Sequence, residues 1–162
     1  IGICYEELKD YDNAANHLDL SIKIFEKSEH IFLTKALFAM SHVEAKRNNF
    51  NVAQEYFLQG KEVAEKSKDK EYTAKFKILE GLYFSNGEYH LINEALSYLT
   101  DRKMFADVEN FATEIGHYFH QQGNLELSNE YYRISIEARR KIKKGEIINE
   151  DQPNSIDSNG IK

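Results

Sequence analysis

The chain has 162 residues, 41% of them hydrophobic, which is long enough for one domain with a core. One proline, eight glycines and 30% charged residues favour an all-α protein over a β-sandwich. A net charge of −6 argues against nucleic acid as a partner of this segment. No apolar run approaches the roughly 20 residues that span a bilayer, so we expect no membrane partner. The single cysteine, Cys4, excludes an internal disulfide and indicates a reducing compartment, so we expect a cytoplasmic protein.

The spacing of apolar residues predicts a series of helices along the chain. Val108, Phe111, Ala112 and Ile115 illustrate the i, i+3, i+4, i+7 spacing that places apolar side chains on one helix face. In chain order, the predicted helices are 1–9, 12–28, 31–48, 51–67, 71–86, 89–101, 104–122 and 125–144. Because the chain begins at Ile1, inside the first repeat, we expect further sequence upstream.

The predicted helices form a repeat of about 34 to 40 residues. In each unit a polar or glycine turn and a large apolar residue precede a small or apolar residue. These last residues, spaced 39, 39 and 36 apart, are Ala14, Ala53, Ile92 and Ser128. Four positions later stands a large apolar residue in each unit: Leu18, Phe57, Leu96 and Tyr132. The pattern predicts an all-α tetratricopeptide-type solenoid, a right-handed superhelix of about four helical hairpins.

We assign the repeats to 1–29, 30–69, 70–103 and 104–145, followed by a tail. The tetratricopeptide pattern also has a glycine and an aromatic three residues apart in the first helix of each hairpin. Three hairpins follow it, and the second has Ser41 and Glu44 instead. The tail, 146–162, contains many Asn, Asp and Ser residues and too few apolar ones to fold, so we expect it to be disordered.

No residue pattern in this segment indicates catalysis, a cofactor or a metal. Glu114, His117 and His120 share one helix side, but the i, i+4 histidine spacing and a further ligand are missing. Phosphate-binding loops and nucleophile elbows are also missing from the sequence. The basic run from Arg139 to Lys144 is explained by the negative C-terminal end of the last helix dipole.

The predicted architecture offers a concave face, formed by the first helix of each hairpin, where extended peptides bind. Counting from the turns places nine residues on this face. They are Lys35, Phe38, His42, Lys46, Lys77, Asn110, Thr113, His117 and His120. Their amides, cations and rings suit a peptide ligand, while an ordinary solvated surface remains the alternative for each residue.

Three stretches resemble a narrower family. They are 35–41, then 94–99 with 103–109, and 130–146, which closes with Lys144-Gly145-Glu146. Together they resemble the C-terminal repeats of the Rap family, the response regulator aspartate phosphatases of spore-forming bacteria. They are also similar to the sister peptide-sensing regulators of the NprR kind, which carry a DNA-binding module.

The resemblance implies a sensor in a quorum-sensing pathway such as that controlling sporulation. In this family the C-terminal repeats bind a short signalling peptide. An N-terminal bundle, which this chain does not contain, binds a response regulator and hydrolyses its aspartyl phosphate. No catalytic residue is therefore assigned here, and phosphatase activity of the full-length protein stays open. An NprR-like sensor domain and a plain repeat adaptor are the alternatives.

Overall fold

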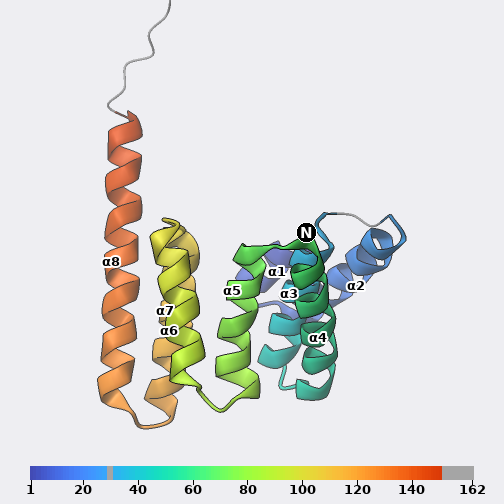
Figure 1. Cartoon of the computed structure of the whole chain (residues 1–162), viewed down its shortest axis with the longest axis horizontal. Coiled ribbons are helices and arrows are strands. Elements are labelled where there is room, and N and C mark those ends of the chain that lie inside the picture. The colour runs from blue at the N-terminus through green and yellow to red at the C-terminus, as the bar shows by residue number, and fades with distance from the viewer. Residues whose placement is uncertain (29–30, 151–162) are drawn as a thin grey trace, which may run out of the picture. The chain divides into compact units, whose positions relative to one another are not determined.

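The computed structural model describes residues 1–28 and 31–150, and within them the chain is helical with no strand. Two compact units are present, Ile1–Arg102 and Lys103–Lys162. The first contains α1 (Gly2–Glu7), α2 (Tyr11–Lys27), α3 (Leu33–Lys46), α4 (Phe50–Ser67), α5 (Lys70–Leu79), the π-helical turn η1 (Glu80–Phe84) and α6 (Tyr89–Asp101). The second contains α7 (Phe105–Gln121) and α8 (Leu125–Glu150). The predicted all-α hairpin architecture is therefore confirmed (Figure 1).

Each hairpin turn contains a residue with left-handed backbone geometry. These residues are Lys9, Asn48, Asn86 with Gly87, and Gly123, and the links between hairpins use Lys68 and Lys103 in the same way. A residue with positive φ lets the chain leave one helix and redirect it within a few positions. Several following helices are then capped by a side chain, as where Asp69 accepts a hydrogen bond from the Tyr72 amide at 3.1 Å.

The small or apolar residues that recur in the repeat lie where the two helices of a hairpin approach closely. Ala14, Ala53 and Ile92 are fully buried, and Ser128 is 1% exposed. Three of the first helices have a glycine that lies against a large side chain of the second helix. A Cβ added to Gly81 would lie 2.6 Å from the Ile92 side chain, and one added to Gly116 would lie 2.8 Å from the ring of Tyr132. Each glycine therefore makes room for a large side chain of the second helix, so that the two helices of the hairpin can pack closely.

In the second hairpin, two polar residues stand where the repeat has a glycine and an aromatic residue, and each forms hydrogen bonds with neighbouring groups. Ser41, fully buried, donates its hydroxyl to the Ala53 carbonyl of α4 at 2.9 Å. Glu44, 4% exposed, accepts hydrogen bonds from Arg47 at 2.6 Å and from the Asn49 amide at 2.7 Å. Because the buried polar atoms of Ser41 and Glu44 have hydrogen-bond partners, the hairpin can bury these two residues in place of the repeat's usual ones.

Helix α8 is longer than predicted. It continues to Glu150, whereas the sequence analysis placed its end at 144 and began the tail at 146. The five residues 146–150 contain neither glycine nor proline, and the first proline is Pro153, so the helix meets no early stop signal. The rest of the predicted tail, 151–162, lies outside the described residues. Within the described part of the chain, no helix combines the length and apolar character needed to cross a membrane.

Candidate functional site

In the first unit, four predicted site residues lie along one side of α3. Lys35, Phe38, His42 and Lys46 are spaced at i, i+3, i+7 and i+11, so their side chains follow one helix face. Lys35 is exposed, Phe38 and Lys46 are half-buried and His42 is 9% exposed. The face thus has a mostly buried centre, formed by Phe38 and His42, between two lysines.

Aromatic rings extend this face from α3 onto α5. The Phe38 ring centroid lies 5.7 Å from that of Tyr72 and 5.3 Å from that of Phe76, both edge-to-face. His42 lies 6.2 Å from Tyr83, in the π-helical turn. Such edge-to-face contacts stabilise ring pairs beyond simple burial. Phe76 is fully buried, while Phe38, Tyr72 and Tyr83 are half-buried and present part of their rings to solvent.

The same face reaches α1 through a carboxylate. Glu6 Oε1 lies 2.7 Å from His42 Nδ1, with the two side chains 17% and 11% exposed. A carboxylate only accepts hydrogen bonds, so Nδ1 carries the proton in this contact. First helices α1, α3 and α5 are therefore joined by side chains of Glu6, Phe38, His42, Tyr72 and Tyr83. We call this set, with Lys35 and Lys46, the inner face.

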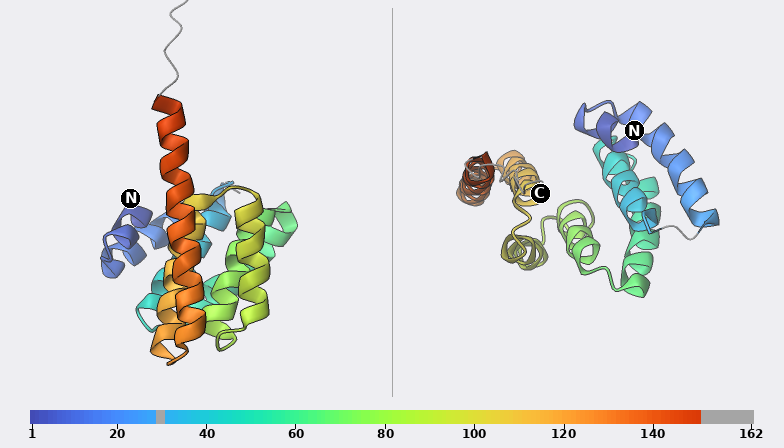
Figure 2. Two further views of the ribbon diagram at one scale, coloured as in Figure 1. Left: turned by 90° about the vertical axis from the view of Figure 1, so that its left-hand side faces the viewer. Right: turned by 90° about the horizontal axis from the view of Figure 1, so that it is seen from above.

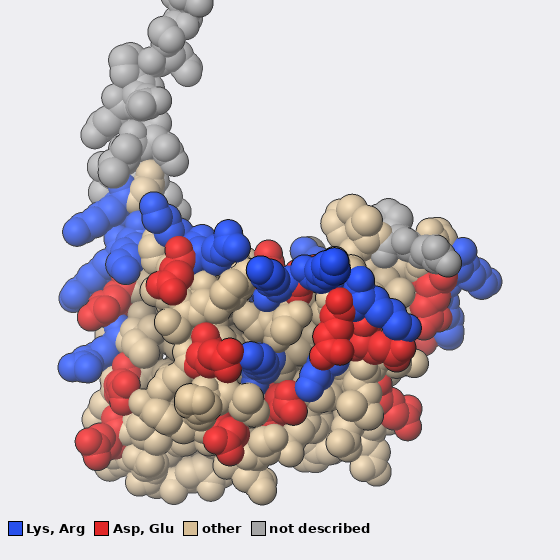
Figure 3. Space-filling model, in the orientation of Figure 1, with Lys and Arg blue, Asp and Glu red and all other residues tan. Residues whose placement is uncertain are grey.

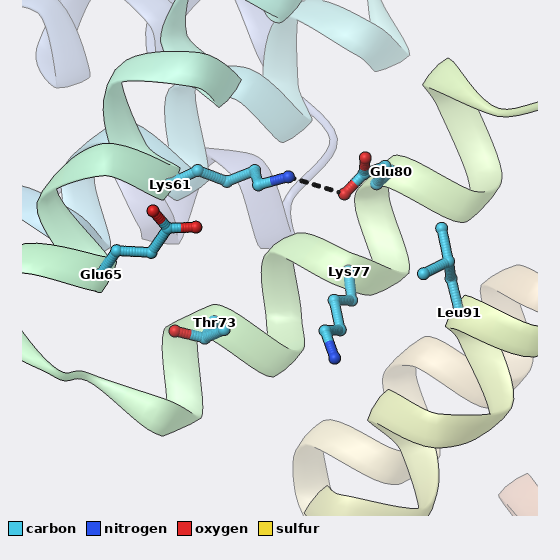
Figure 4. A pocket seen from close by; sticks show the side chains of 6 residues that line it. All are labelled: Lys61, Glu65, Thr73, Lys77, Glu80 and Leu91. Carbon is cyan, nitrogen blue, oxygen red and sulfur yellow. Dashed lines mark hydrogen bonds and ion pairs between the residues drawn. The ribbon is translucent and has the colours of Figure 1, made fainter.

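Lys77 lies elsewhere in the first unit. Its Nζ is 2.7 Å from Glu94 of α6, and the hydrogen bond and positive charge of Lys77 hold the pKa of Glu94 below its ordinary value. Figure 4 shows Lys77 among the side chains that line a groove between α4, α5 and α6. That cavity, of about 260 Å³, is lined by Lys61, Glu65, Thr73, Lys77, Glu80 and Leu91. A second cavity of about 450 Å³, between α5 and α6, also includes Thr73 and Lys77.

The π-helical turn explains the displacement of Lys77. Counted back from the turns, Lys77 stands at the same distance as Phe38 and Thr113 do in their hairpins. A π-helix has an i→i+5 hydrogen-bond pattern and so takes up an extra residue in its turn. Residues before η1 are therefore rotated relative to those after it, and a count that assumes a regular α-helix assigns Lys77 to the wrong side.

In the second unit, two of the predicted site residues contact α8. The Thr113 and Ser135 hydroxyls are 2.7 Å apart. The Tyr132 hydroxyl lies 2.6 Å from His117 Nδ1, and the two rings meet edge-to-face at 5.9 Å. When Tyr132 donates to Nδ1, the neutral His117 ring carries its proton on Nε2 and can donate it to a carbonyl of a ligand.

Asn110 and His120 of α7 are exposed. They accompany Thr113 and His117 on one side of α7, so the four residues predicted in this unit do share a face. Within the residues that the structure describes, no three His, Cys, Asp or Glu side chains are grouped in a way that would hold a metal ion.

Three inner-face residues were missed by the sequence analysis. Glu6 follows Gly2 by four positions, as His120 follows Gly116, so the same count applied to the first hairpin would have found it. Tyr72 and Tyr83 had no such signal. Tyr72 lies near the start of α5 and Tyr83 lies in the π-helical turn, where the repeat count fails.

Comparisons with known proteins identify relatives. No family model matches the chain. Response regulator aspartate phosphatase I of Bacillus subtilis (strain 168) is 67% identical over all 162 residues, which span 41% of that protein. The crystal structure of the apo form of RapI has a TM-score of 0.84 over 89% of this chain and 53% of that chain, again at 67% identity. A Rap protein complexed with Competence and Sporulation Factor has a TM-score of 0.85 at 25% identity, covering 89% of this chain and 40% of that one.

The resemblance expected from the three sequence stretches is thus confirmed along the whole chain and in three dimensions. The chain spans about two fifths of the length of the curated relative that it matches at 67% identity. The chain is homologous to the Rap response regulator aspartate phosphatases, and its helical repeats correspond to their C-terminal region.

Proposed function

We propose that this chain is the peptide-binding sensor region of a Rap-type quorum-sensing regulator. The observation that carries the proposal is its 67% identity over 162 residues to a response regulator aspartate phosphatase. A Rap protein with the same fold has been solved with Competence and Sporulation Factor, one of the signalling peptides of Rap homologues.

The inner face of the first unit supplies the chemistry that a short extended peptide needs. The half-buried rings of Phe38, Tyr72 and Tyr83 offer apolar surface that is already held in place by ring contacts. Lys35, exposed at one end, offers a cation for a terminal carboxylate or an acidic side chain, and Lys46 lies at the other end. Pre-organised rings bind a ligand at a smaller entropic cost than mobile side chains.

In the second unit, we propose that Asn110, Thr113, His117 and His120 form a peptide-contacting face of that unit. The Asn110 amide donates and accepts hydrogen bonds, and the His117 ring offers Nε2, so both suit a peptide backbone. Lys77 is no longer part of the proposed peptide site, because it pairs with Glu94 in the groove between α4, α5 and α6.

The activity of the longer protein is part of the same proposal. By homology, sequence outside this chain would bind a response regulator and hydrolyse its aspartyl phosphate, and peptide binding would shift that activity between two states. The protein would act in the cytoplasm, where it meets the response regulator. The relatives are named as phosphatases or Rap regulatory proteins, which favours this assignment over an NprR-like transcriptional regulator or a plain adaptor.

A thermal-shift screen with pentapeptides tests the proposal. A ligand at 100 times its Kd stabilises the folded state by about 2.7 kcal/mol, which raises the Tm of a chain of this size by several degrees. We expect some pentapeptides to raise the Tm and scrambled versions of the same peptides to leave it unchanged. A complete library in which no member raises the Tm would contradict the proposed function.

Substitutions in the protein at the proposed contact residues then locate the site where such a peptide binds. Lys35→Ala, Phe38→Leu and Asn110→Ala should each weaken the response, because they remove a cation, a ring and an amide from the proposed site. Lys66→Ala is the matched control, since Lys66 is exposed on α4 and, among the residues that the structure describes, pairs only with Glu62 of the same helix. If all three site variants respond like the wild type, the inner face is not the peptide site.

A further inference from the structure

Helix α8 carries a row of basic side chains that the fold does not use. Arg133, Arg140 and Lys144 are spaced at i, i+7 and i+11 and so share one line along the helix, with Lys143 beside them. We call these four residues the basic stripe. Lys and Arg side chains are gathered along this part of α8 in Figure 3. The stripe covers about 16 Å of helix at a rise of about 1.5 Å per residue.

The packing of α8 against α7 does not explain the stripe. Neighbouring cations do have partners in the unit: Arg139 Nε lies 2.6 Å from Glu109, and Lys141 Nζ lies 4.9 Å from the Phe105 ring centroid. The four residues of the stripe are exposed, and none forms an ion pair or hydrogen bond with any other residue that the structure describes. The buried side of α8 is a different one, formed by Ser128, Tyr131, Ser135 and Ala138.

The helix dipole does not explain the stripe either. The sequence analysis attributed the basic run to the negative C-terminal end of this helix. The helix continues to Glu150, however, and its last turn contains no basic residue. Because the effect of the dipole falls off within the last turn, Lys144 lies too far from the end of the helix for a favourable interaction. That explanation of the basic run is therefore wrong.

The surroundings of the stripe restrict what fits on it. Glu126 and Glu130 lie toward the start of α8, and Glu137 lies between Arg133 and Arg140 on the neighbouring line. A broad anionic surface such as a DNA duplex or a lipid bilayer would bring its own charges against these carboxylates. A single helix contacts only a narrow strip of its neighbour. Between Arg133 and Arg140 of the basic stripe, Ile136 is 48% exposed and offers an apolar contact.

We propose that the basic stripe is a docking surface for an acidic amphipathic helix of a partner protein. The partner helix would place carboxylates opposite Arg133, Arg140 and Lys144, and an apolar side chain opposite Ile136. Charge complementarity would set the register, and the contact with Ile136 would add specificity for a helix of the right pattern. This surface is independent of the proposed peptide site on the inner face, so either can fail without the other.

A designed peptide tests the docking surface directly on the whole chain. The probe is an alanine-rich helical peptide with glutamates at i, i+7 and i+11 and one leucine beside them, labelled for fluorescence anisotropy. We expect it to bind at low ionic strength and to weaken as salt is added. A peptide of the same composition with the glutamates spread around the helix should have an affinity lower by about tenfold or more.

Two variants separate docking from general attraction of anions. Arg133→Gln combined with Arg140→Gln and Lys144→Gln should lower the affinity about tenfold or more. Lys27→Gln combined with Lys66→Gln and Lys68→Gln removes the same charge elsewhere and should leave it unchanged. Ile136→Ser should also weaken binding, although it changes no charge.

Equal binding of both peptides, tighter binding of a DNA duplex or of anionic vesicles, or no effect of the stripe variant would each overturn the proposal. Circular dichroism of every variant checks that α8 is retained.

Discussion

At the scale of single residues, the fold depends on positions where a side chain has no room. A Cβ at Gly60 of α4 would lie 2.2 Å from the Cζ atom of Phe76, which is fully buried in α5. Gly145, by contrast, lies in α8 with no other heavy atom within 4 Å of such a Cβ. The same substitution at these two helical glycines therefore has opposite consequences.

We predict that Gly60→Ala lowers the free energy of unfolding by about 1–2 kcal/mol, because the displaced Phe76 ring outweighs the better helix propensity of alanine. Gly145→Ala should raise it by up to about 1 kcal/mol through propensity alone. Urea denaturation of both variants and the wild type measures the two changes. A stabilised Gly60→Ala variant would show that α4 and α5 are not packed as described.

The left-handed turn residues are also single-residue features with a cost. Lys68 ends α4 at φ 56° and ψ 33°, a conformation that a non-glycine residue adopts at a cost of about 1 kcal/mol or more. Glycine adopts it freely but has a more flexible unfolded state. The two effects partly offset each other, and the backbone cost in the folded state is the larger.

Lys68→Gly is therefore expected to raise the free energy of unfolding by up to about 1 kcal/mol. Gly123→Ala, at φ 76° in the last hairpin turn, is the converse change and should lower it by a similar amount. Thermal unfolding followed by circular dichroism compares them. A destabilised Lys68→Gly variant, with Gly123→Ala unchanged, would contradict the role given to these turns.

At the scale of the helix, the sequence predicted every helix in the described residues, because each one carries a long apolar periodicity between turn residues. The extra length of α8 was missed, because polar residues were interpreted as disorder although no helix breaker precedes Pro153. The π-helical turn was also missed, since nothing in the composition of Glu80–Phe84 marks an extra residue. That single turn is why the count from the turns placed the α3 residues on one helix face but put Lys77 on a different side of its helix from the inner face.

The degenerate second hairpin offers a prediction at the same scale. Glu44 joins Arg47 and the Asn49 side chain, and Arg47 also lies 2.9 Å from Asp12 of α2. Glu44→Ala should lower the free energy of unfolding by about 1–3 kcal/mol, because it removes the charged acceptor of the Arg47 and Asn49 hydrogen bonds. A double-mutant cycle with Arg47→Ala should show coupling of at least about 0.5 kcal/mol. Strict additivity would mean that the network contributes nothing to the hairpin.

At the scale of the whole molecule, the repeat places a first helix in every hairpin, and some side chains of these helices lie outside the hydrophobic core. Sequence analysis found these helices, because the turns mark their period. The sequence alone could not show which of these side chains contact one another, because the Glu6–His42 contact and the ring contacts of Phe38 join helices far apart in the sequence. The ligand class in our proposal comes from a Rap protein solved with Competence and Sporulation Factor.

Hydrogen–deuterium exchange with and without a stabilising pentapeptide tests the central claim most directly, because it reports where on the chain the peptide acts. If the inner face is the sensor site, the amides of Leu33–Lys46 should exchange more slowly when the peptide is bound. Protection of that segment should disappear in the Phe38→Leu variant and persist in Lys66→Ala. Protection confined to Phe50–Ser67 and Tyr89–Asp101, with no change in Leu33–Lys46, would place the peptide in the groove around Lys77 and contradict the account.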